Sequence, residues 1–127
     1  MKRIFAMSIP HKGQRYDTVG DYQDVHGVTF FTISEMPDER YEQLVLVHEL
    51  IEKILCTHRG ISDESIDAFD LSFESARLDG NDDEPGHDPD APYHAEHVFA
   101  EKIERLLAEE LGVDWDTYDK TVVGLSQ

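Results

Sequence analysis

The chain has 127 residues, of which 28 are Asp or Glu and 11 are Lys or Arg, so its formal net charge is −17. This charge repels the phosphates of nucleic acids and of anionic membranes, and it excludes direct nucleic-acid binding as the expected function. The hydrophobic content of 39%, with six Phe, five Tyr and one Trp, predicts one folded domain over residues 1–127.

The first part of the chain is rich in strand-forming residues. Lys2–Ile9 is the first expected strand, and Tyr16–Gln23 and Val28–Ser34 follow on either side of the turn sequence Asp24–Gly27. We expect these segments to form a three-stranded antiparallel sheet.

Two helices are expected next. Ser34 and Pro37 mark the start of the first, which runs to about His58. Ser62 caps the second helix, whose spacing of apolar residues predicts a buried stripe of Ile66, Phe69 and Phe73.

An acidic loop rich in Pro and Gly, Leu78–Pro92, precedes two more helices. The long helix from Pro92 to Leu111 is expected to bury Phe99, Ala100, Ile103, Leu106, Leu107 and Leu111, and a short helix lies within Val113–Val123. In the loop, Asp79, Asn81 and Asp83 match the first EF-hand ligand positions, but Glu84 stands where that turn requires Gly, which excludes an EF-hand. Strands followed by helices predict an α+β fold with the sheet against three to four helices.

Three ionisable residues interrupt the apolar run Leu44–Leu55. On a helix, His48, Glu49 and Glu52 lie within about 100° of arc. Buried acids and imidazoles are costly unless they are paired or bound to a cation. The HExxE spacing therefore predicts a divalent metal site (Zn, Mn or Mg), with His48 and Glu52 as ligands and Glu49 as the base that takes a proton from bound water.

Further ligands must come from other helices. On the second helix, Asp67, Asp70 and Glu74 form an acidic face, and Asp67 is the preferred ligand. On the third helix, His97 lies at the margin of the apolar stripe and is preferred to His94. Cys56 is expected to be a buried hydrophobic residue.

The segment Arg40–Glu74, with HELIE on one helix and DESIDAFD on the next, resembles the compact zincin-like metallopeptidases. The resemblance implies that His48 is a ligand, that Glu49 is the general base, and that Glu64 or Asp67 is the third ligand. Glu52 stands where that family has His.

A second resemblance is to the all-α nucleotide pyrophosphohydrolases, whose ExxE…ExxD signature binds magnesium. Glu49 and Glu52, followed by Glu64 and Asp67, reproduce that signature. The N-terminal strands are foreign to that fold. The whole chain also resembles small uncharacterised proteins of tailed bacteriophages, a likeness that implies no function.

Neither a membrane span nor the apolar stretch of a signal peptide is recognisable in the sequence, and the single cysteine excludes an intramolecular disulfide. We therefore expect a cytoplasmic protein without membrane association. The favoured function is a metal-dependent hydrolase of a small molecule or peptide. The alternatives are a magnesium-dependent pyrophosphohydrolase, an acidic inhibitor or DNA mimic that binds a basic protein partner, and a purely structural pairing of His48 with Glu52.

Overall fold

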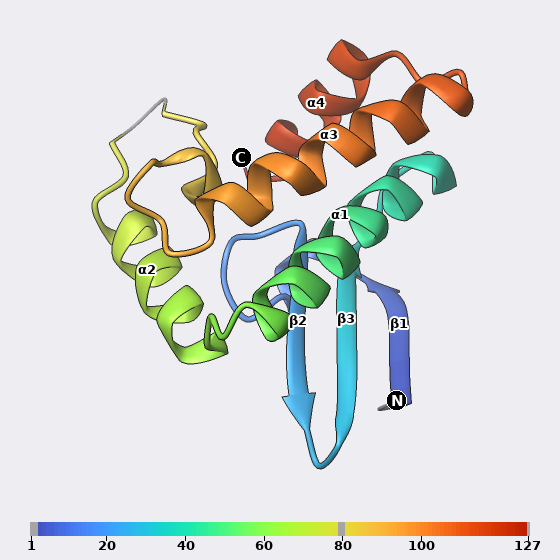
Figure 1. Ribbon diagram of the computed structural model, residues 1–127. Helices are drawn as coiled ribbons and strands as arrows, with labels where there is room; N and C mark the ends of the chain where they lie inside the picture. Colours follow the sequence, from blue (N-terminus) through green and yellow to red (C-terminus); the bar gives the residue numbers. More distant parts are fainter. Residues whose placement is uncertain (1–2, 79–80, 127) are drawn as a thin grey trace.

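The structure is a computed structural model that describes residues 3–78 and 81–126 (Figure 1). Three strands form one sheet: β1 (Arg3–Ile9), β2 (Gly20–Val25) and β3 (Val28–Ser34). Helix α1 (Glu39–His58) packs across one face of the sheet, and α3 (His94–Glu110) lies beside α1 (Figure 1). Helices α2 (Asp63–Ser75) and α4 (Trp115–Gly124) flank this pair, so the α+β prediction is confirmed.

The expectation of a purely antiparallel sheet is wrong in one pairing. The strand order is β1-β3-β2; β2 and β3 form an antiparallel hairpin, but β1 runs parallel to β3, with Ile9 opposite Ser34. The segment between β1 and β2 crosses the end of the sheet, so β1 and β2 are not adjacent. Strand β3 then lies between them as the central strand. The connection contains a short 3-10 helix, η1 (His11–Gly13).

Strand β2 begins at Gly20 rather than at the expected Tyr16, and side chains of the preceding loop contact β3 and α2. The Gln14 amide donates a hydrogen bond of 3.0 Å to the Thr32 carbonyl, and the Tyr16 hydroxyl donates to Asp70 at 3.2 Å. Lys2, the expected first strand residue, lies outside the described residues, as does Asp79 of the acidic loop.

The helix boundaries follow local capping. Asp38, Ser62 and Asp114 each accept a hydrogen bond from a backbone N–H in the first turn of α1, α2 and α4. Asp38, four residues after Ser34, is therefore the cap that starts α1. The acidic loop contains a second short 3-10 helix, η2 (Pro85–His87).

The buried stripe of α1 repeats every fourth residue: Leu44, His48, Glu52 and Cys56. The facing stripe of α3 is also polar in part and consists of Glu96, His97, Ala100, Glu104 and Ala108. This stripe corrects the expected one, because Phe99 and Leu106 are exposed. The small side chains of Ala100 and Ala108 let the two helices approach closely, since interaxial distance depends on the residues in contact.

Two apolar clusters lie at the ends of this interface. One includes Ile33, Leu44 and Tyr118, and the other includes Phe31, Cys56 and Tyr93. The ionisable side chains of α1 and α3 lie between them. Among the described residues, none of the helices combines the length and apolar character needed to cross a membrane.

Candidate metal centre

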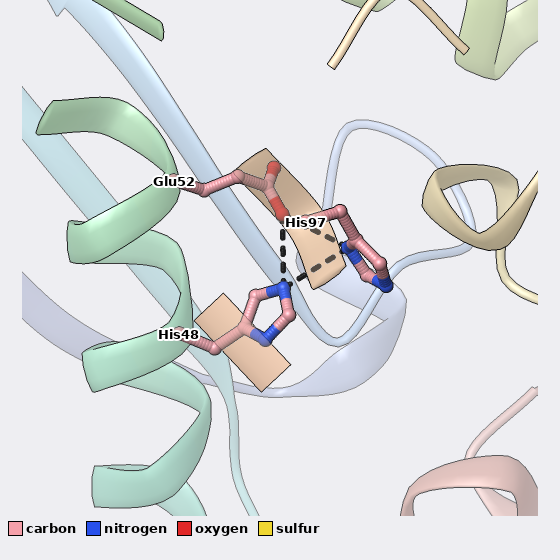
Figure 2. A group of neighbouring side chains, drawn as sticks. All are labelled: His48, Glu52 and His97. Carbon is pink, nitrogen blue, oxygen red and sulfur yellow. Dashed lines mark hydrogen bonds and ion pairs between the residues drawn. The ribbon is translucent and has the colours of Figure 1, made fainter. Parts of the chain in front are cut away.

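Three donor atoms from α1 and α3 converge between the two helices (Figure 2). His48 Nε2 lies 2.9 Å from Glu52 Oε2, His97 Nδ1 lies 3.0 Å from the same oxygen, and the two nitrogens are 3.1 Å apart. All three residues are buried. A tetrahedral ion with bonds of about 2.0–2.2 Å separates its ligands by little more than 3 Å, so the triangle is suited to a single cation.

The orientation of His48 is set by a carboxylate that sequence reasoning missed. Glu104 Oε1 lies 2.7 Å from His48 Nδ1, and the Tyr118 hydroxyl donates to the other oxygen of Glu104 at 2.6 Å. Because an ionised carboxylate only accepts, Nδ1 carries the proton in this bond. The lone pair of neutral His48 is then on Nε2, which faces Glu52 and His97. A carboxylate behind an imidazole is a recurrent arrangement around protein metals.

In the absence of a cation, protons stabilise this cluster. Burial lowers the pKa of His48, but hydrogen bonds to Glu104 and Glu52 outweigh it and hold the pKa well above its usual value. Burial likewise raises the pKa of Glu52, yet the two imidazoles bring it down to about 2. A divalent cation would replace the imidazole protons and neutralise the same carboxylate.

Glu49 differs from the other acids of α1. It lines a cavity of about 670 Å³ together with His48, Glu52 and His97, and no hydrogen bond or ion pair engages its carboxylate within the described chain. Burial raises the pKa of Glu49 well above the usual value, and the charge of Glu52 raises it further. The backbone of Gly20 lies against it, since a Cβ there would be 2.7 Å from Glu49 Cγ.

The structure thus brings His48, Glu52 and His97 together and places Glu49 on the wall of the same cavity. It does not bring Asp67 to the donor atoms: the Asp67 carboxylate lies 3.3 Å from Arg15, which also binds Asp21. Glu64 is exposed and does not line the cavity.

Asp70, one helical turn after Asp67, is the buried acid of α2. It accepts hydrogen bonds from Tyr93 and Tyr16, and burial raises its pKa to about 6. Its position on the buried side follows from Ile66, four residues earlier, a spacing visible in the sequence. Cys56 is buried as expected, and burial raises the pKa of its thiol to about 12.

The loop that contains η2 closes over His97. Glu84 Oε2 lies 3.0 Å from His97 Nε2, and the rings of His87 and His97 are 4.8 Å apart. Neither Glu84 nor His87 was expected at the site, because their sequence neighbourhood indicates only an acidic loop.

No protein-family model matches the chain, and neither does any curated protein or any solved structure.

Proposed function

We propose that the protein is a metal-dependent hydrolase whose cation is bound by His48, Glu52 and His97. The observation that carries this proposal is the pair Glu104–His48. Glu104 accepts the Nδ1 proton and so directs the Nε2 lone pair toward the two other donors. A purely structural ion pair would not need a third donor, His97, at 3.1 Å from an imidazole nitrogen that already contacts Glu52.

Glu49 is suited to act as the general base. A bound divalent cation lowers the pKa of a coordinated water and polarises the bond that is hydrolysed. Glu49 lies on the cavity wall with a carboxylate that no described residue engages, and its raised pKa lets it accept a proton from water more readily than an ordinary carboxylate does. These are the roles that the zincin resemblance assigns to His48 and Glu49, with Glu52 and His97 in place of the usual further ligands.

The three donor atoms restrict which metal ion is expected at the site. Two imidazole nitrogens and one carboxylate favour zinc or manganese, because magnesium prefers oxygen ligands and retains water. The cavity volume of about 670 Å³ is in the range of small-molecule sites, and its walls carry many more carboxylates than arginines. A neutral or cationic small molecule or peptide end therefore fits better than a polyanion.

The pyrophosphohydrolase alternative has less support. It requires Glu64 and Asp67 beside Glu49 and Glu52, but Glu64 is exposed and Asp67 is paired with Arg15. Inorganic pyrophosphate released from nucleoside triphosphates with magnesium alone would favour it.

Metal analysis of untagged protein tests the proposal. The parent should take up zinc or manganese, His48→Ala should lose the equivalent bound at this site, and His58→Ala, an exposed histidine of the same helix, should keep it. Glu49→Gln should bind the metal as the parent does while hydrolysis of a panel of chromogenic esters and peptides is lost. A parent that binds no metal, or a fully active Glu49→Gln, overturns the proposal.

A further inference from the structure

His97 has a second ring nitrogen that the site above leaves without a role. Its Nε2 is buried and makes no hydrogen bond to any described residue, although it lies 3.0 Å from Glu84 Oε2. Figure 2 shows this nitrogen pointing away from His48 and Glu52. The partner of this buried nitrogen is thus a single carboxylate oxygen whose placement does not have hydrogen-bond geometry. Two atoms that bind the same cation lie close together, but they lack the angles of a hydrogen bond. His97 Nε2 and Glu84 Oε2 have this arrangement.

Further donor atoms surround this nitrogen. Glu84, His87 and His97 each offer one donor atom, and these atoms lie within 4.8 Å of one another. The Nε2 atom of His87 lies 3.1 Å from Glu101 Oε1, and a carboxylate on one nitrogen orients a ligating imidazole. The side chains of Glu84 and His87 are 46% and 43% exposed, so the group is open to ions from solvent.

The loop is shaped to the imidazole of His97. A Cβ atom at Gly86 would lie 2.3 Å from His97 Cγ, so only glycine lets the backbone of η2 rest on the ring. The His94 ring also contacts this backbone, with Nδ1 2.9 Å from the Gly86 carbonyl oxygen. The contacts of the Gly86 backbone with His97 and His94 therefore hold Glu84 and His87 at the outer edge of His97.

We propose that the protein binds two divalent cations that share His97. One is the cation of the proposed function, on Nδ1 with His48 and Glu52, and the second lies on Nε2 with Glu84 and His87. The proposal rests on the proposed function for the first cation only. When the second cation binds, the ring loses its remaining N–H proton to solvent and becomes an imidazolate bridge.

The two cations offset most of the negative charge in this arrangement. Glu52, Glu104, Glu84 and Glu101 each carry one negative charge, and the imidazolate of His97 carries a fifth. Two divalent cations supply four positive charges. The second cation would stand at the solvent-facing side of the first and provide a further point of attachment for substrate oxygen atoms.

Zinc titration of untagged apoprotein, followed by calorimetry and elemental analysis, counts the sites. We expect two equivalents in the parent and in His58→Ala, and one equivalent in His87→Ala and in Glu84→Gln. Glu84 is half-buried, His87 is exposed, and neither belongs to an apolar cluster, so these substitutions leave the hydrophobic core unchanged.

The outcomes separate the two proposals. One equivalent in both the parent and His87→Ala, absent in His48→Ala, overturns the second site and leaves the proposed function standing. Two equivalents in both the parent and His87→Ala overturn the assignment of Glu84 and His87. No uptake at all overturns both proposals.

Copper(II) tests the bridge itself. An imidazolate bridge couples two copper spins antiferromagnetically, so the paramagnetic resonance signal should fall as the second equivalent is added. A signal that doubles instead shows two separate sites and overturns the shared role of His97.

Discussion

At the scale of single residues, the site depends on which groups hold protons after burial. His48 is placed between two carboxylates, Glu104 and Glu52, and the Tyr118 hydroxyl binds the outer oxygen of Glu104. The chain Tyr118–Glu104–His48 thus determines which imidazole nitrogen is free. Removing the Tyr118 hydroxyl should therefore weaken cation binding at the proposed site without removing any ligand.

Tyr118→Phe should weaken zinc binding about tenfold, because outer hydrogen-bond partners of metal ligands contribute effects of this size. Tyr41→Phe is the matched control, since Tyr41 packs against the Tyr118 ring at 5.2 Å and no described residue hydrogen-bonds its hydroxyl. Calorimetric titration of both variants measures the difference. Equal affinities would contradict the role of Tyr118.

Asp70 should give the protein a characteristic pH dependence. Burial raises its pKa from 3.8 to about 6, so the folded state binds the proton more tightly than the unfolded chain does. The contribution is favourable below about pH 4 and is lost as the pH rises through 6, because the buried carboxyl must then ionise. A shift of this size corresponds to about 3 kcal/mol.

Urea unfolding in the presence of EDTA, at several values between about pH 4 and pH 8, checks this expectation. The free energy of unfolding of the parent should fall with rising pH relative to that of Asp70→Asn. Parallel pH profiles for the two proteins would show that Asp70 ionises in the folded state as it does in water.

At the scale of elements, the site is a product of two facing helices and one loop. Helix α1 provides His48 and Glu52, four residues apart, α3 provides His97, and η2 covers His97 through Gly86. Helix α2 contributes Asp70 and depends on its Ser62 cap, whose hydroxyl accepts from the Ser65 N–H at 3.2 Å.

Gly86→Ala should reduce zinc affinity at least tenfold, because the added methyl group must displace His97 or the loop. Gly124→Ala is the control: it lies at the end of α4, nothing is within 4 Å of the added atom, and Ala is the better helix former. Calorimetry on both variants separates the local contact from a general effect of losing glycine. Unchanged affinity in Gly86→Ala would refute the close fit.

Ser62→Ala should lower the free energy of unfolding by about 1 kcal/mol, the usual cost of losing a serine cap. Ser72→Ala, an exposed position inside the same helix, should be neutral or slightly stabilising. Urea unfolding of the two variants provides the comparison. A loss in Ser72→Ala as large as that in Ser62→Ala would show that the cap is not the cause.

At the scale of the whole molecule, charge is the dominant property. A net charge of −17 on 127 residues makes the folded chain repel itself, and many of these carboxylates line the cavity. On the sheet face opposite α1, Phe5 and Phe30 stack at 5.8 Å and are both exposed. A basic protein partner for the acidic surface stays a prediction.

Added salt should raise the melting temperature by several degrees between about 10 mM and about 300 mM NaCl, because screening weakens repulsion between exposed charges. His48→Ala should show the same rise, since the effect belongs to the surface and not to the site. Calorimetric melting of both proteins in EDTA measures it. A melting temperature that falls with salt would mean that attractive ion pairs such as Arg15–Asp21 outweigh the repulsion.

The sequence by itself determined the local order of this protein. Apolar periodicity and capping residues predict helices close to α1, α2, α3 and α4, and the HExxE spacing places His48 and Glu52 on one helical face. These features depend on residues within about one helical turn of each other. The local sequence is therefore sufficient to predict them.

Only the tertiary structure decided which distant residues meet. The parallel pairing of β1 with β3, the pairing of Arg15 with Asp67, and the approach of Glu104 and Glu84 to the two histidines all join residues far apart in the sequence. On α3, the buried face lies about one residue away from the face that the apolar pattern predicts. Phe99 and Leu106 are therefore exposed, and Glu104 is buried. Such contacts depend on how helices and loops pack together, because successive residues on a helix are only about 100° apart and periodicity alone does not name the partner.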